Sequence, residues 1–325
     1  MIGITGIGVY IPEQSLTIDE IAVQMSIEFR DKTGIKSVLY EPKLSATDMA
    51  VHASKMAIEE AKITPMDIDW IINTQASIPD YLTWQVSAKV QDELGANNAC
   101  FFDVYQNCSG FIMGLITAKN FLLADEHTNT VLVNTSEKWD ATIKSRMVGK
   151  LIMGEAGAAA VIQSDSTGNY ILGYSQIGHG LLNDVAKMNI GTLNPPIDDN
   201  QEEDYYYHVT NYEKAKTDMI PVNVELFHKV GIQAIENSNL SIEDIDHIIF
   251  PGVGFGLFQK VMESFDMPLE KTNFRYVSTT GDTGSVDLLL NYYRMMRDGL
   301  LKQGEHVLMI AQGAGATWSA IVLQV

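Results

Sequence analysis

A cysteine lies at the point where one apolar run gives way to another, in the segment DVYQNCSGFIMGL at residues 103–115. The run before Cys108 has the composition of a buried strand. The run after it is apolar on nearly all sides, which is typical of a helix inside a large core. The amino end of such a helix points free N–H groups and a partial positive charge at the sulfur, so we expect a thiolate. We interpret Cys108 as a nucleophile, against the alternative that it packs as a small hydrophobe, which is the role we expect for Cys100.

The elements that must position this cysteine alternate between short β-rich runs and longer runs with helical periodicity. Helix starts are predicted at Thr17, with Glu20 completing a capping box, and at Thr47-Asp48. The alternation indicates an α/β protein with largely buried sheets. Strands are predicted at residues 2–9, 70–74, 99–104, 130–134, 158–162, 247–250 and 307–311.

The chain also resembles itself. Residues 63–72 (ITPMDIDWII) and 240–249 (LSIEDIDHII) share one frame, and similar pairs at a near-constant offset are 131–136 with 307–312 and 101–110 with 274–284. We interpret these pairs as an internal duplication into two α/β halves, residues 1–165 and 166–325, although any two α/β segments share some short strings. Because ligands gather beyond the carboxyl ends of such strands, the turn of Cys108 should meet its counterpart, Gly281-Asp282-Thr283.

Composition excludes several classes of function. The 325 residues include 41 acidic and 22 basic side chains, a net charge of −19 that would repel nucleic acid and anionic membranes. The first residues lack the features of a signal peptide, and no apolar run approaches the roughly 20 residues of a membrane span, so we expect a cytoplasmic protein. Two cysteines without metal-ligand spacing indicate neither a disulfide nor a metal site.

The segment around Cys108 resembles the nucleophile turn of the thiolase superfamily, and the whole chain resembles β-ketoacyl-(acyl carrier protein) synthase III. The matching motifs are ITGIGVYIP at residues 4–12, TGIKS at 33–37, DVYQNCSGF at 103–111, LIMGEAGAAAVI at 151–162 and GAGATW at 313–318. The resemblance implies a five-layered αβαβα fold of two similar halves, a homodimer, and acyl thioester substrates without a cofactor. It also implies that Cys108 carries the acyl group and that the amides of Cys108 and Ala314 form an oxyanion hole.

The chain departs from the family at two catalytic positions. Gly252, after Pro251, stands where the family has its histidine, and Asp282 stands where it has an asparagine. Glycine has no side-chain donor and an ionised aspartate only accepts hydrogen bonds, so the usual decarboxylative condensation is in doubt. His179 or His208, in the irregular stretch 176–220 that could cap the site, are alternative sources of an imidazole, although a loop histidine is usually solvated.

The positions implied for coenzyme A or pantetheine binding are altered as well. Glu28, Lys32, Phe255 and Leu257 occupy them, and a carboxylate at position 28 would repel phosphates. We therefore expect the acyl group to arrive on an acyl carrier protein rather than on free coenzyme A. Two clusters are candidate docking patches for an acidic carrier, with ordinary solvated helix faces as the alternative: Lys144, Arg146 and Lys150, and Arg294, Arg297 and Lys302.

The leading hypothesis is an acyl-thioester transferase in fatty-acid-derived or specialised metabolite biosynthesis. Cys108 receives the acyl group, and Asp282 takes a proton from an alcohol, amine or carbon nucleophile. Asp282 would also raise the pKa of Cys108, or it simply holds a turn. A second hypothesis retains carbon–carbon bond formation by a decarboxylating synthase. A third makes the chain a non-catalytic scaffold, paired with a related subunit in a larger acyltransferase complex.

Overall fold

The computed structural model describes residues 1–22 and 26–325. Its nine main strands follow one hydrogen-bonded order, β13-β14-β15-β10-β1-β9-β6-β4-β5. β4 is parallel to β5 and β6, and β13 is parallel to β14, while the other neighbours are antiparallel. The strands are β1 (Gly3–Tyr10), β4 (Trp70–Thr74), β5 (Cys100–Val104), β6 (Thr130–Glu137), β9 (Ala156–Gln163), β10 (Tyr170–Gly178), β13 (His247–Ile249), β14 (His306–Gly313) and β15 (Thr317–Gln324).

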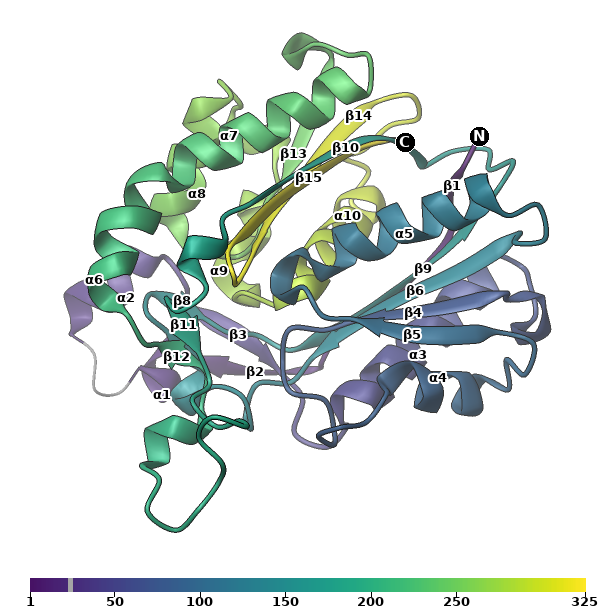
Figure 1. The fold of residues 1–325 in the computed structure, drawn as a ribbon. Helices are drawn as coiled ribbons and strands as arrows, with labels where there is room; N and C mark the ends of the chain where they lie inside the picture. Colours follow the sequence, from purple (N-terminus) through teal and green to yellow (C-terminus); the bar gives the residue numbers. More distant parts are fainter. Residues whose placement is uncertain (23–25) are drawn as a thin grey trace.

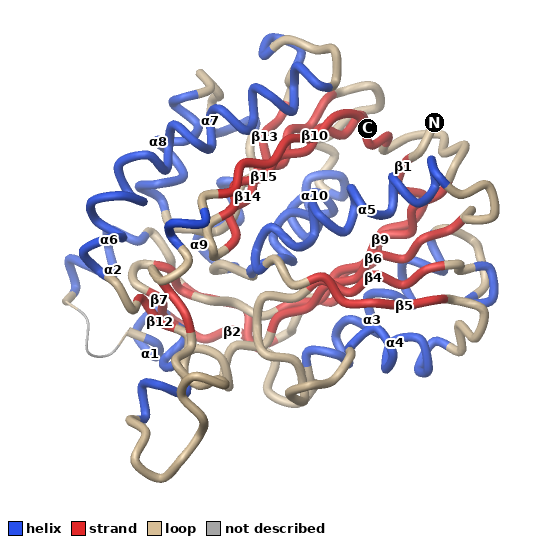
Figure 2. The backbone as a smooth tube through the Cα atoms, viewed as in Figure 1, coloured by secondary structure: helices blue, strands red, loops and turns tan. Residues whose placement is uncertain are grey.

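The strands form two layers, which meet where Gly3 of β1 pairs with Tyr170 of β10 (Figure 1). Helices α5 (Gly110–Ala124) and α10 (Asp287–Arg297) lie between the two layers. α3 (Ala46–Glu60) and α4 (Val86–Leu94) cover one outer face, and α7 (Ile220–Asn237) and α8 (Phe255–Ser264) cover the other (Figure 2). The predicted five-layered α/β fold is confirmed.

The helix that follows Cys108 is buried as its sequence predicts. Phe111, Ile112 and Leu115 of α5 are fully buried, in the same core cluster as Leu288 and Leu289 of α10. Burial of a large apolar side chain contributes about 1.5–3 kcal/mol, so this central layer holds the two strand layers together. The amino end of α5 is thereby fixed in the middle of the molecule.

All seven predicted strands are present, whereas β10 and β15 were not predicted. The Thr17–Glu20 capping box is confirmed. The predicted helix start at Thr47-Asp48 is wrong, because Ser45 accepts the Asp48 N–H and α3 begins at Ala46.

The strand order reads alike on the two sides of the β1–β10 junction, since β4 and β13 end the repeated segments 63–72 and 240–249. The third pair of segments differs: residues 101–110 contain most of β5, whereas residues 274–284 contain helix α9 (Phe274–Thr280). The division near residue 165 stays a prediction. Short elements complete the described chain: β2 (Gln14–Thr17), α1 (Ile18–Ile21), α2 (Ile27–Thr33), β3 (Ser37–Tyr40), η1 (Pro65–Asp67), η2 (Asn107–Ser109), η3 (Lys144–Arg146), β7 (Met147–Val148), β8 (Leu151–Ile152), η4 (Gly180–Leu182), β11 (Ala186–Lys187), η5 (Glu202–Tyr205), β12 (His208–Val209), α6 (Tyr212–Lys214), η6 (Ala215–Met219), η7 (Ile242–Asp244), η8 (Leu269–Lys271) and η9 (Gly284–Val286).

Candidate active site

Cys108 lies in the 3₁₀ turn η2, between β5 and α5, and is partly exposed. The hairpin that joins β14 to β15 packs against this turn. Ser109 Oγ donates to the Thr317 carbonyl at 3.3 Å, and a Cβ on Gly313 would lie only 2.4 Å from the Gln106 carbonyl oxygen. Ala314, the next residue, is thereby held beside the Cys108 turn, and its oxyanion role stays a prediction.

Asp282 is buried and held mainly through its backbone. Its N–H donates to Ile152 O at 2.8 Å, and its carbonyl accepts the Gly154 N–H at 2.8 Å. Its Oδ1 accepts the Gly284 N–H, also at 2.8 Å. Turn η9, which follows Asp282, contacts turn η2, so the structure brings the Cys108 and Asp282 turns together.

Burial and surrounding charge oppose ionisation of the cysteine. The pKa of Cys108 is raised well above its usual value by burial and by the charges of Asp282, Glu137 and Asp287. The expected resting thiolate is therefore wrong, because burial of the sulfur, together with three carboxylates, outweighs the partial charge of the α5 amino end. The predicted effect of Asp282 on the thiol agrees in direction with this shift.

Gly252, which is predicted to stand at the position of the family histidine, has no room for a side chain. A Cβ on Gly252 would lie 2.3 Å from the Gly281 carbonyl oxygen and 2.8 Å from the Gly281 carbonyl carbon. The Gly252 N–H donates to Asp287 Oδ2 at 2.9 Å. The backbone of the Asp282 turn thus occupies the space into which a side chain at position 252 would point.

Two buried carboxylates beside Cys108 were missed at the sequence level. Glu137, the last residue of β6, accepts hydrogen bonds from the Ala76 N–H at 2.9 Å, the Ser77 N–H at 2.7 Å and the Ser285 hydroxyl at 2.6 Å. Asp287 opens α10 and is 1% exposed. Burial raises the pKa of Glu137, and burial with the charge of Asp282 raises that of Asp287 to about 8. The only sequence signal was a carboxylate that ends an apolar strand or begins an apolar helix. The same pattern occurs at solvent-exposed turns, so it does not identify a buried site.

Tyr207, in the irregular stretch 176–220, lies near the candidate active site. Its N–H donates to Thr142 O at 2.7 Å, and its ring packs with a small apolar cluster around Trp139. Burial raises the pKa of Tyr207, and the charge of Cys108 is the next cause, which places the phenol near the thiol. Tyr207 also lines a cavity of about 580 Å³ that Lys144 and His208 line as well.

Neither candidate histidine is shown beside the thiol. His208 Nδ1 lies 2.9 Å from Tyr206 O, and its side chain borders the cavity rather than Cys108. His179 pairs through its backbone with Ala316, in the hairpin that carries Ala314. Its Nδ1 is buried without a hydrogen-bond partner among the described residues.

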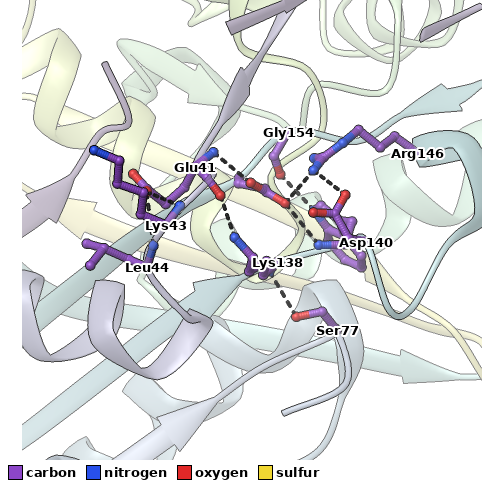
Figure 3. Close-up of polar contacts among 10 residues, drawn as sticks. Glu41, Lys43, Leu44, Ser77, Lys138, Asp140, Arg146 and Gly154 are labelled. Carbon is purple, nitrogen blue, oxygen red and sulfur yellow. Dashed lines mark hydrogen bonds and ion pairs between the residues drawn. The ribbon is translucent and has the colours of Figure 1, made fainter. Parts of the chain in front are cut away.

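Figure 3 shows a network of polar contacts and ion pairs that includes Glu41, Lys138 and Arg146. Arg146 Nη2 contacts Asp140 at 2.5 Å and Glu155 at 2.7 Å, and Glu155 also accepts the Glu41 N–H at 2.7 Å. Lys138 Nζ donates to the Glu41 carbonyl. The Arg146 side chain is 7% exposed, so it cannot belong to a surface docking patch, and that expectation is wrong.

The network reaches the site through Trp139 and Gly154. Trp139 Nε1 donates to Gly154 O at 2.7 Å, and the Gly154 N–H donates to the Asp282 carbonyl. In the second predicted patch, Arg294 is half-buried and donates to Thr280 Oγ1 at 2.6 Å, whereas Arg297 is exposed.

The positions implied for coenzyme A binding carry other contacts. Lys32 and Glu28 pair with each other at 2.7 Å on the surface of α2. The Phe255 ring lies over Gly34 and against Phe274, with ring centroids 4.5 Å apart. Leu257 packs against the hydrophobic core cluster that contains Phe250 and Phe258. Cys100 is exposed, so its predicted burial is wrong, because β5 is the end strand of the sheet.

Comparison with known proteins agrees with this fold. Residues 102–180 match 3-oxoacyl-[acyl-carrier-protein (ACP)] synthase III, and residues 235–325 match the C-terminal domain of the same family. The chain is 30% identical over 328 residues to the β-ketoacyl-[acyl-carrier-protein] synthase III of Clostridium acetobutylicum, covering 99% of this chain and 98% of the relative. The 3-oxoacyl-[acyl-carrier-protein] synthase III from Aquifex aeolicus VF5 superposes with a TM-score of 0.85 at 25% identity over the full length of both chains.

The fold and these matches define an acyl-transferring, thiolase-like condensing enzyme. The chain belongs to the 3-oxoacyl-[acyl-carrier-protein] synthase III family. The priming β-ketosynthase of the R1128 polyketide pathway shares the fold, with a TM-score of 0.86 at 23% identity over 100% of this chain and 96% of that one. Across residues 1–22 and 26–325, we find no cluster of metal-ligating side chains and no helix long and apolar enough to cross a membrane.

Proposed function

We propose that the chain is an acyl-thioester transferase in which Cys108 carries the acyl group and Asp282 moves the protons. The observation that carries this proposal is the filled space at Gly252 beside a buried Asp282. Without an imidazole at position 252, nothing there donates to the carbonyl of a decarboxylating malonyl group. Among the charged groups around Cys108, Asp282 has the largest effect on the pKa of the thiol, and a carboxylate can accept a proton.

In the first half-reaction, Asp282 takes the proton from the Cys108 thiol as the sulfur attacks the thioester carbonyl. The carbon–sulfur bond to the carrier then breaks, and the carrier sulfur takes the proton from Asp282. In the second half-reaction, Asp282 takes a proton from the acceptor, which attacks the acyl carbon, and Cys108 leaves and regains its proton. The amides of Cys108 and Ala314 are proposed to stabilise the oxyanion in both steps.

The acyl donor is proposed to be a carrier-protein thioester in a cytoplasmic pathway to fatty-acid-derived or specialised metabolites. The names of the relatives support the carrier, because they are synthases acting on acyl carrier protein. The Glu28 carboxylate, 2.7 Å from the Lys32 amine, supports this choice, because it would repel coenzyme A phosphates.

We further propose a homodimer formed at β5. This strand ends the sheet, so in the described chain one of its edges has no strand partner, and exposed Tyr105 follows it directly. Native mass spectrometry tests this assembly. A monomer contradicts it, and assembly only with a related chain favours a heteromer.

Intact mass measurement after incubation with acyl thioesters tests the proposed function. We expect the mass of the acyl group to be added to the native protein and to Cys100→Ala, and not to Cys108→Ala. No adduct on the native protein would favour a scaffold subunit. Release of carbon dioxide from a malonyl thioester would instead favour the decarboxylating synthase.

A further inference from the structure

Five polar side chains are buried on the outer face of the sheet, beneath α3 and α4 (Figure 1). Each is at most 2% exposed, and the reaction proposed at Cys108 uses none of them. Six of their oxygen and nitrogen atoms have no hydrogen-bond partner among the described residues. We name these residues the outer polar cluster: Thr47 of α3, Asn73 of β4, Ser87 of α4, and Asn134 and Ser136 of β6.

Strand register places the three strand residues of the cluster side by side. Asn73 pairs with Asn134 on the neighbouring strand, about 4.8 Å away, and Ser136 follows two residues later on the same face. This face is the one that α3 covers. A Cβ on Gly157, the register partner of Ser136, would lie 2.6 Å from the Met49 carbonyl oxygen in α3.

The first turns of α3 and α4 bring the two helix residues to the same layer. Asp103, the register partner of Asn73 on β5, accepts the Ser87 N–H at 3.0 Å, so α4 begins directly over this part of the sheet. Thr47 lies in the first turn of α3, two residues before Met49. The five side chains therefore share one buried layer between the sheet and the two helices.

The unpartnered atoms match a small neutral ligand that both donates and accepts hydrogen bonds. Three are hydroxyl oxygens, which do either, two are amide oxygens, which accept, and one is the Asn134 amide nitrogen, which donates. The amino ends of α3 and α4 carry partial positive charge, which disfavours a cation. An anion would face the amide oxygens of Asn73 and Asn134, which only accept.

We propose that the outer polar cluster is a binding site for ordered water molecules. A buried water makes about three hydrogen bonds to polar groups that the protein leaves unpaired, so about two or three waters serve six atoms. The site also supports the candidate active site from behind, because Ser136 directly precedes Glu137, whose carboxylate accepts the Ser285 hydroxyl on the other face of β6. The inference does not depend on acyl transfer.

Substitutions that remove a hydroxyl without adding volume test the site, because the sign of their effect depends on the water. Thr47→Val and Ser136→Ala each take away a partner of bound water, so the equilibrium constant for unfolding should rise by about 3-fold to 10-fold. In a dry cluster the same changes remove an unsatisfied buried polar atom, and the constant would fall. Urea unfolding measures the constant, and a fall in both variants overturns the proposal.

Ser54→Ala is the matched control on α3. Ser54 is fully buried, but its hydroxyl donates to the Ala50 carbonyl at 2.7 Å within the helix. Its loss should change the constant little, because that carbonyl also accepts a helix bond and alanine favours the helix. A rise in Ser54→Ala equal to that in Thr47→Val would show a general cost of losing a buried hydroxyl and would contradict a site specific to the cluster.

A crystal structure of the wild-type protein provides the direct observation. We expect at least two ordered waters within about 3.2 Å of the six atoms. Direct hydrogen bonds among the five side chains, with no water between them, would refute the inference. Unfolding in potassium chloride and in choline chloride at equal ionic strength should give the same constant, and a fold stabilised only by potassium would place a cation in the site instead.

Discussion

Two buried acidic regions of this molecule are connected through Gly154 and are stabilised in different ways. In the network of Figure 3, Glu155 pairs with Arg146, and Glu41 accepts from Tyr10 and lies near the charge of Lys138. At the candidate active site, Asp282, Asp287 and Glu137 accept hydrogen bonds from backbone N–H groups and hydroxyls, without an ion pair in the described residues.

The difference appears in the protonation of the carboxyl groups. Burial tends to raise the pKa of Glu41, but hydrogen bonds from Tyr10 and nearby backbone N–H groups, with the charge of Lys138, lower it overall. Burial prevails at Asp282, Asp287 and Glu137, and their pKa values are raised. Hydrogen bonds, together with the charge of Lys138, thus favour the ionised form of Glu41, whereas burial favours the protonated forms of the active-site carboxyl groups.

The largest expected effect is at the candidate active site. Asp282→Asn should slow acylation of Cys108 by about 10²–10⁴-fold, because the amide cannot accept the thiol proton. Its unfolding free energy should not fall, since the amide oxygen still accepts the Gly284 N–H and a buried charge is removed. Single-turnover mass kinetics and urea unfolding measure the two quantities. A fully active variant would show that Asp282 only holds its turn.

In the network around Arg146 and Glu155, the expected loss is in the stability of the fold. Arg146→Met leaves Glu155 buried without its cation, which should lower the unfolding free energy by about 3–5 kcal/mol. Lys144→Met is the matched control, since the Lys144–Glu202 pair is exposed and its loss should have no measurable effect. Urea unfolding of both variants decides. Equal effects would remove the distinction between the two acidic regions.

A smaller effect is expected at Gly252, which packs against the Asp282 turn. Gly252→Ala forces a Cβ to within 2.3 Å of the Gly281 carbonyl oxygen, which should cost about 1–3 kcal/mol and slow acylation by displacing Asp282. Gly256→Ala, on the same segment, meets nothing within 4 Å and should be neutral or slightly stabilising. Thermal unfolding compares the two. An undiminished stability of Gly252→Ala would mean that the Asp282 turn yields easily.

The most gradual effect concerns pH. Asp287 has a raised pKa in the folded protein, so between its unfolded value of about 4 and about 8 the folded state binds more protons than the unfolded state. Stability should therefore fall as pH rises across that window, by up to about 1.4 kcal/mol per pH unit for one proton. Urea unfolding of wild type and Asp287→Asn from pH 5.5 to pH 8.5 should show a shallower fall in the variant. Parallel curves would contradict the raised pKa.

Sequence patterns located one side of the site and not the other. Cys108 was found because an apolar run on each side marks a buried strand and a buried helix, and Asp282 because its turn matches that of Cys108 and stands at a family position. Glu137 and Asp287 carry no such mark. A carboxylate that ends a strand or begins a helix is ordinarily a solvated cap, and only packing shows that these two face inward.

The same reasoning explains the errors over charge. The thiolate expected at Cys108 followed from the local field of one helix, but the pKa depends on every charge and on the solvent around the sulfur. Arg146 was assigned to a surface patch because lysines flank it in sequence. In the fold, its side chain points inward and donates to the carboxylate of Glu155.

The sequence by itself determined the α/β layers, the buried helix behind Cys108 and the glycine at position 252, because periodicity and residue type are local properties. The tertiary structure alone decided that a backbone carbonyl fills the space at Gly252 and that three carboxylates share a site with no ion pair among the described residues. Proton affinity is set by neighbours far apart along the chain, and only folding brings those neighbours together.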